Sequence, residues 1–140
     1  MAERTGAKLV WQSGMKFEAR SASGHTLTVD SPGRPGHSGA GPMELLLVAV
    51  AGCTAMDVVA ILEKMRQPLA GLEVEIAGDR AAANPKYYTA ITLTYRLRGK
   101  GLDRSKAERA VELSHSTYCS ALTSLRPDCA VTAAIEISDD

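Results

Sequence analysis

The sequence predicts an α+β fold in a single domain, residues 1–140. Short segments that alternate apolar and polar residues, a pattern typical of strands, occur both early and late in the chain. Between them lies one long apolar segment, residues 43–66, which follows a loop rich in Gly and Pro. A second stretch with helical spacing of apolar residues covers about residues 103–125. Strands, a long helix, a hairpin, a second helical region and a last strand are therefore expected in this order.

The strands are predicted from alternation and from the breaks between them. They are expected at residues 8–12, 16–19, 25–30, 72–77, 91–98 and 131–137. The clearest is 91–98, where Ile and Leu alternate with Thr and Arg. Asn84-Pro85 marks the turn between the fourth and fifth strands, which predicts a hairpin.

The long helix should begin at about Pro42, which suits a first helical turn, and stop before Pro68. It spans about 36 Å at 1.5 Å per residue. Because it is apolar on all sides, it should be buried on all sides. One small chain cannot cover it, so we expect a second copy and a two-fold homodimer. A membrane span is disfavoured, because Asp57 at its centre would cost about 2.5–3.5 kcal/mol.

The second helical region should begin at Asp103, a good N-cap residue. A break is expected near Ser114–Thr117, and the helix should restart through Cys119 and stop before Pro127.

Charge and cysteine content limit the class of protein. Sixteen basic and sixteen acidic residues give no net charge, which argues against nucleic-acid and membrane partners. The first residues lack an apolar signal segment, so a cytoplasmic location is expected. Three cysteines without a CxxC pair indicate thiols, not a disulfide scaffold or a zinc site. The three histidines, His25, His37 and His115, have no metal-ligand spacing either.

Cys53 lies in the most apolar part of the chain, where a thiol is normally silenced by burial. To react it would need a cation from elsewhere, and Arg34 or Arg20 could supply one. Glu44 could orient that arginine through a bidentate pair. From the residues alone, a small core residue stays an open alternative. Asp57, one turn later, is expected to be a buried acid with a hydrogen-bond partner.

Cys119 lies in a run of hydroxyl residues. If Ser116 or Thr117 caps the new helical turn, Cys119 sits near its positive end, which favours a thiolate. Core packing is again the alternative. Phosphate-binding glycine loops and the GxSxG pattern of serine hydrolases are absent from the sequence.

The segments Gly41-Pro42-Met43-Glu44-Leu45-Leu46-Leu47, Gly52-Cys53-Thr54-Ala55 and Tyr118-Cys119 resemble the OsmC/Ohr family, in a branch with the Pro-Met-Glu-Leu-Leu-Leu motif. The resemblance implies an intertwined homodimer whose long central helices pack against antiparallel-rich sheets. It also implies a thiol peroxidase for organic hydroperoxides. No metal or prosthetic group is implied as cofactor.

In the implied mechanism, Cys53 attacks the hydroperoxide and becomes a sulfenic acid, and Cys119 then forms a disulfide with it. A dithiol reductant of lipoyl type on a partner protein restores the thiols. Arg34 and Glu44 are the implied activators. One departure from the family concerns the glutamate: Met43 directly follows the proline, and Glu44 comes one residue later. This shift rotates the side chain by about 100°.

That departure keeps two further hypotheses open. The chain could be a non-enzymatic member of the fold that binds a small ligand or senses oxidants. It could also be a structural dimer with core cysteines, in which case the sulfurs of Cys53 and Cys119 would lie too far apart to bridge.

Overall fold

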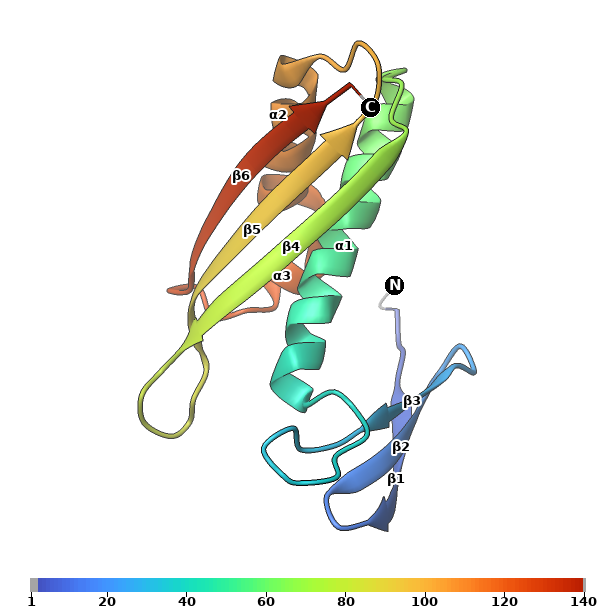
Figure 1. The fold of residues 1–140 in the computed structure, drawn as a ribbon, viewed down its shortest axis with the longest axis vertical. Coiled ribbons are helices and arrows are strands. Elements are labelled where there is room, and N and C mark those ends of the chain that lie inside the picture. Colours follow the sequence, from blue (N-terminus) through green and yellow to red (C-terminus); the bar gives the residue numbers. More distant parts are fainter. Residues whose placement is uncertain (1–2, 140) are drawn as a thin grey trace. The chain divides into compact units, whose positions relative to one another are not determined.

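The structure, a computed structural model, describes residues 3–139. The chain forms two compact units, one ending at Leu46 and one beginning at Leu47 (Figure 1). The elements are β1 (Ala7–Ser13), β2 (Lys16–Ser21), β3 (Thr26–Val29), α1 (Pro42–Lys64), β4 (Gly71–Arg80), β5 (Tyr88–Arg98), α2 (Arg104–Leu113), the π-helical turn η1 (Ser114–Tyr118), α3 (Ser120–Thr123) and β6 (Ala130–Ser138). The predicted α+β class and element order are confirmed.

The first unit is an antiparallel sheet in the order β1-β2-β3, followed by the Gly/Pro loop. Its register places one apolar row across the strands, Leu9, Ala19 and Leu27, and a second row two residues along, Trp11, Phe17 and Val29. Side chains two apart on a strand share a face, so these six residues form one apolar face.

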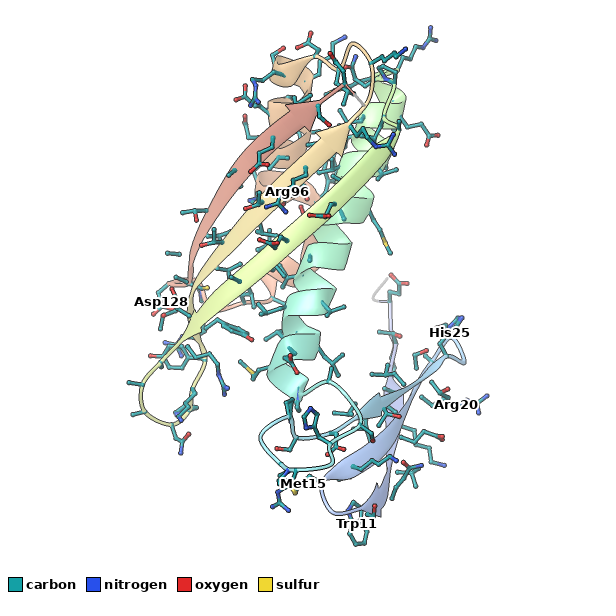
Figure 2. The ribbon with its side chains drawn as sticks, viewed as in Figure 1. Trp11, Met15, Arg20, His25, Arg96 and Asp128 are labelled. Carbon is teal, nitrogen blue, oxygen red and sulfur yellow. The ribbon has the colours of Figure 1, made fainter. Side chains whose placement is uncertain are left out.

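The second unit is a sheet in the order β4-β5-β6, with β4 and β5 antiparallel and β5 and β6 parallel. The alternation predicted for β5 is observed. Ile91, Leu93, Tyr95 and Leu97 are buried on the face covered by the helices, and Arg96 lies on the open face (Figure 2). There Arg96 forms ion pairs with Glu73, Glu75 and Glu136.

Helix α1 is covered on one face only. Its fully buried residues are spaced four apart: Val50, Thr54, Val58 and Leu62. On another face Val48 is 62% exposed and Met56 74% exposed. The expectation that the helix is buried on all sides is therefore wrong for a single chain, because one three-stranded sheet covers only one stripe of a helix.

The length and composition of α1 would also allow it to cross a membrane. Its polar residues argue for a different environment. Thr54 is hydrogen-bonded to Tyr95 of β5, and Asp57 accepts a hydrogen bond from Ser114 of η1. These polar residues of α1 therefore have partners within the protein.

Candidate active site

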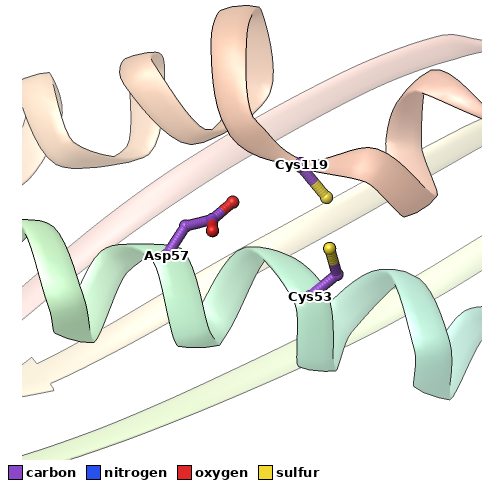
Figure 3. A group of neighbouring side chains, drawn as sticks. All are labelled: Cys53, Asp57 and Cys119. Atoms are coloured by element: carbon purple, nitrogen blue, oxygen red, sulfur yellow. The ribbon is translucent and has the colours of Figure 1, made fainter. Parts of the chain in front are cut away.

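Two cysteines and an aspartate from different elements converge in the second unit (Figure 3). Cys53 and Asp57 are one turn apart on α1, and Cys119 follows the π-helical turn η1. The sulfurs of Cys53 and Cys119 and a carboxylate oxygen of Asp57 all lie within 4.8 Å of one another. The alternative of sulfurs too far apart to bridge is therefore excluded.

The phase of α1 explains why Cys53 and Asp57 sit at the edge of the packed surface. Each directly precedes a fully buried residue, Thr54 or Val58. One residue rotates a helical side chain by about 100°, so both side chains lie beside the buried stripe and not within it. Cys53 is half-buried, whereas Cys119 is only 2% exposed.

The turn η1 determines where Cys119 lies. Leu113 ends α2, and the N–H of Cys119 then donates to the carbonyl of Ser114, five residues back, at 2.8 Å. Such π-helical turns often occur at functional sites. Cys119 itself, not Ser116 or Thr117, is the N-cap of the short helix α3, and its sulfur accepts from the N–H of Leu122 at 3.5 Å. The predicted break was correct, but the wide turn moves the cap to the cysteine.

The expectation of a thiolate at Cys119 is wrong. Burial raises the pKa of the Cys119 thiol to about 11, helped by the neighbouring Cys53 and Asp57 and opposed by the N–H of Leu122. Loss of solvent penalises the charged form more than one backbone N–H stabilises it. The thiol is thus protonated at neutral pH.

A chain of buried hydrogen bonds begins at Asp57. Ser114 Oγ donates to Asp57 Oδ2 at 2.9 Å, and Thr54 Oγ1 lies 2.8 Å from Ser114 Oγ. Thr54 Oγ1 is also 2.8 Å from the hydroxyl of Tyr95, which lies 2.7 Å from His115 Nε2. Asp57 therefore has the expected hydrogen-bond partner, but it is half-buried and not buried as expected.

Arg34, Arg20 and Glu44 belong to the first unit. Arg34 is exposed in a loop that Asp30 shapes by accepting from the N–H groups of Ser38 and Ser31, bonds that lower the pKa of Asp30. The side chain of Arg20 points away from the sheet (Figure 2). It pairs with polar positions in β1 and β3, on the face opposite the apolar one.

Glu44 begins α1 as a capping residue. Its Oε1 accepts from the N–H of Gly41 at 3.0 Å. Among residues 3–139 no ion pair joins Glu44 to an arginine. Its predicted pairing with Arg34 stays a prediction.

The sulfurs and the carboxylate are also atoms of the kind that bind metals. Zinc sites use four protein ligands, or three and a water. The group offers three, which together with a water would suffice for zinc, so the expectation of no metal cofactor stays a prediction. His115 is committed to Tyr95.

Comparison with known proteins shows which family the chain belongs to. A family model described as OsmC-like protein matches residues 35–134. Protein YhfA of Escherichia coli strain K12 is 37% identical over 131 residues, covering 94% of this chain and 96% of YhfA. The chain belongs to the OsmC-like family. The resemblance seen in the sequence is thereby confirmed.

Solved structures agree with this OsmC-like fold. A hypothetical protein from Aquifex aeolicus VF5 has a TM-score of 0.89 and 29% identity, with 99% of each chain covered. The organic hydroperoxide resistance protein OhrB of Bacillus subtilis has a TM-score of 0.69 and 17% identity, with 96% of this chain and 98% of that chain covered. The latter likeness concerns the fold alone.

Sequence reasoning missed three members of the site of this OsmC-like protein: Tyr95, Ser114 and His115. Their signal was present but weak. Tyr95 occupies an inward position of an otherwise aliphatic strand, where a buried hydroxyl needs a partner. The polar residues Thr54 and Asp57 on an otherwise apolar helix likewise indicated that polar partners were needed.

Proposed function

We propose that this OsmC-like protein is a thiol peroxidase that reduces organic hydroperoxides to alcohols. The observation that carries the proposal is the approach of two free thiols, Cys53 and Cys119, from separate elements to within 4.8 Å. Closing a disulfide requires the two sulfurs to approach from this separation to about 2.05 Å.

In the first step the Cys53 thiolate attacks one peroxide oxygen. The O–O bond breaks, and the departing alkoxide takes up the proton that the Cys53 thiol had released, which gives the alcohol. Cys53 becomes a sulfenic acid. In the second step Cys119 attacks the Cys53 sulfur, the S–O bond breaks and water leaves. A dithiol such as dihydrolipoate reduces the resulting disulfide by exchange and is itself oxidised.

The half-exposed thiol is assigned the first role and the buried thiol the second. A peroxide from solvent can reach Cys53, whereas Cys119 is enclosed. We assign the alkyl group of the substrate to a pocket of about 340 Å³ beside Asp57. Its lining is largely apolar: Ala60, Ile61, Met65, Leu113 and Tyr118, with Asp57 and Lys64.

Arg34 is proposed to stabilise the Cys53 thiolate, and Glu44 to hold Arg34. An arginine beside a thiol favours the charged form. Arg34 is preferred over Arg20, because Arg20 lies on the polar face of its sheet.

We propose a homodimer as the working form. An open groove of about 750 Å³ between α1 and β4 is lined mostly by apolar residues, among them Val48, Met56, Val59 and Leu72. The apolar face of the first sheet is likewise uncovered, with Trp11 63% exposed. Exposed apolar surfaces of this kind mark interfaces, and a second copy would cover both. A cytoplasmic location would keep the thiols reduced.

The test is a thiol titration of the reduced protein with cumene hydroperoxide, in the presence of a chelator and with Cys129→Ser as background. We expect two thiols to disappear per chain, one equivalent of alcohol to form, and dihydrolipoate to sustain turnover. Cys53→Ser should consume no peroxide, and Cys119→Ser should stop at the sulfenic acid, which dimedone traps. Peroxide consumption by Cys53→Ser at the rate of the parent would refute the mechanism.

The second candidate is a dimer that binds an apolar ligand or senses oxidants without turnover. The capping contact of Glu44 with Gly41 favours it, because a capping carboxylate is less available to an arginine. It predicts one oxidation per chain and no turnover with dihydrolipoate, so the same titration separates the two functions.

A further inference from the structure

We propose that Asp57 accepts the proton of the Cys119 thiol while that thiol attacks Cys53, and that a chain of hydroxyl groups positions Asp57 for this transfer. This role rests on the peroxidase function proposed above. It concerns the step in which the disulfide closes.

Disulfide closure needs a base close to Cys119. The thiolate is the attacking species, yet Cys119 is 2% exposed and its pKa is raised to about 11. Solvent hydroxide has little access to such a site. A neighbouring group must therefore take the proton as the sulfur–sulfur bond forms.

Asp57 is the group near both sulfurs that is suited to accept a proton. The titratable groups around it are Cys53 and Lys64 on its own helix, Tyr95 on β5, and His115 and Cys119 from η1 and its end. Lys64 is a cation with no site for another proton. His115 Nε2 is engaged in a hydrogen bond with the Tyr95 hydroxyl, and that hydroxyl is also hydrogen-bonded to Thr54.

The hydrogen-bond chain has one consistent direction when Asp57 is ionised. The single hydroxyl proton of Ser114 is donated in a hydrogen bond to Asp57, so the Ser114 oxygen accepts a hydrogen bond from Thr54. Thr54 then accepts from Tyr95, and Tyr95 accepts from His115 Nε2–H. Each hydroxyl thus donates toward the carboxylate, which fixes the orientation of its side chain.

This hydrogen-bond chain leaves one side of the Asp57 carboxylate available to accept a proton. Among the described residues, Ser114 is the one hydrogen-bond donor to Asp57, and it binds Oδ2. The remaining oxygen lone pairs can face the thiols, which lie within 4.8 Å. Burial lowers the pKa of His115, which favours the neutral ring at neutral pH.

The proton balance of the step is complete. The Cys119 S–H bond breaks and its proton moves to Asp57. The S–S bond forms, the S–O bond of the Cys53 sulfenic acid breaks, and the departing hydroxide takes the proton from Asp57 to give water. Asp57 is ionised again at the end.

A test that needs no peroxide measures this step alone. In a Cys129→Ser background, the half-exposed Cys53 is first converted with dithiobis(nitrobenzoate) into a mixed disulfide at low pH. A pH jump then starts the attack of Cys119, which releases the coloured nitrothiobenzoate. The parent, Asp57→Asn, Asp57→Glu, Ser114→Ala and the control Glu112→Gln are compared. Glu112 is an exposed acid on α2 that pairs with Arg109.

We expect the parent and Glu112→Gln to close at a rate that does not rise with pH between about pH 6 and pH 9, since Asp57 replaces hydroxide as base. Asp57→Asn should close about 100-fold or more slowly at neutral pH. Its rate should rise about tenfold per pH unit, because the Cys119 thiol must then ionise unaided. Asp57→Glu should restore the flat profile, and Ser114→Ala should be slower but flat.

A parent-like rate in Asp57→Asn would overturn the role of Asp57, as would equal slowing in the Asn and Glu variants with flat profiles. A parent-like rate in Ser114→Ala would overturn the positioning chain. Because this test uses no hydroperoxide, either result would leave the peroxidase proposal standing. That proposal is tested separately by the thiol titration with cumene hydroperoxide.

Discussion

The two units of the chain differ in how they bury apolar residues. Among residues 3–139, twelve of the thirteen buried hydrophobic residues form a core between the helices and the sheet of the second unit, and the thirteenth, Ala19, belongs to the first unit. The first sheet has an apolar face, yet Leu9 and Trp11 on that face are 54% and 63% exposed. Exposed apolar faces of this kind mark interaction surfaces.

This difference separates the chemistry into two parts. The thiols, Asp57 and its hydroxyl chain are assembled inside the well-packed unit. The proposed activators, Arg34 and Glu44, belong to the unit that lacks a core of its own. Activation is thus the part of the function that should depend most on the second copy.

The largest effect is expected from a charge on the apolar face of the first sheet. Leu9→Glu should raise the dissociation constant of the proposed dimer at least about 100-fold, because burying an unpaired carboxylate costs several kcal/mol. Light scattering after gel filtration measures the mass. Lys8→Glu, on the opposite face of the same strand, is the control and should stay dimeric. If both variants remain dimers, this face is not an interface.

Truncation in the core of the second unit should come next. Leu62 is fully buried on α1, so Leu62→Ala should lower the free energy of unfolding by about 2–5 kcal/mol. Urea denaturation followed by circular dichroism measures this loss. It should be the same at low and high protein concentration, in contrast to the effect of Leu9→Glu. A loss below 1 kcal/mol, by the same principle, would contradict the assigned core.

A smaller effect is expected from the buried hydroxyl chain. Thr54→Val keeps the side-chain shape but leaves Tyr95 and Ser114 each without one partner. The cost should be about 1–3 kcal/mol of unfolding free energy. Thr92→Val, on the exposed face of β5, is the matched control and should change little. Equal stability of the two variants would show that the hydrogen bonds between these hydroxyl groups add nothing to the free energy of unfolding.

The smallest of these effects should come from Arg34→Ala. Loss of an arginine that lowers a thiol pKa by one unit slows the reaction of Cys53 with hydroperoxide about tenfold at neutral pH. Arg20→Ala is the control and should react like the parent. The slowing should disappear as the pH approaches the pKa of a free thiol. If Arg20→Ala is the slower variant, the assignment of the arginine is reversed.

Much of the architecture could be predicted because it follows from local periodicity. Alternation placed β5 and its inward face, and the run from Pro42 placed α1 with both ends nearly as observed. Asp103 was predicted as the N-cap of α2, and its carboxylate accepts from the N–H groups of Ser105 and Lys106. These features depend on residues close together in the chain.

The protonation state of Cys119 could not be predicted in this way. A cap-like position suggested a thiolate, but the burial that raises its pKa comes from distant elements packed around it. The partners of Asp57 and Thr54 were likewise hidden, because Ser114 and Tyr95 lie on other elements.

The sequence by itself determined the strands, the long apolar helix with its thiol and acid one turn apart, and the family. Helical and strand periods are local, so they can be read from the residues. Only the tertiary structure decided that Cys53 and Cys119 meet, that a π-helical turn delivers the second thiol, and that a single chain covers one face of α1. Each of these depends on contacts between elements far apart in the chain, and on the exclusion of water that such contacts produce.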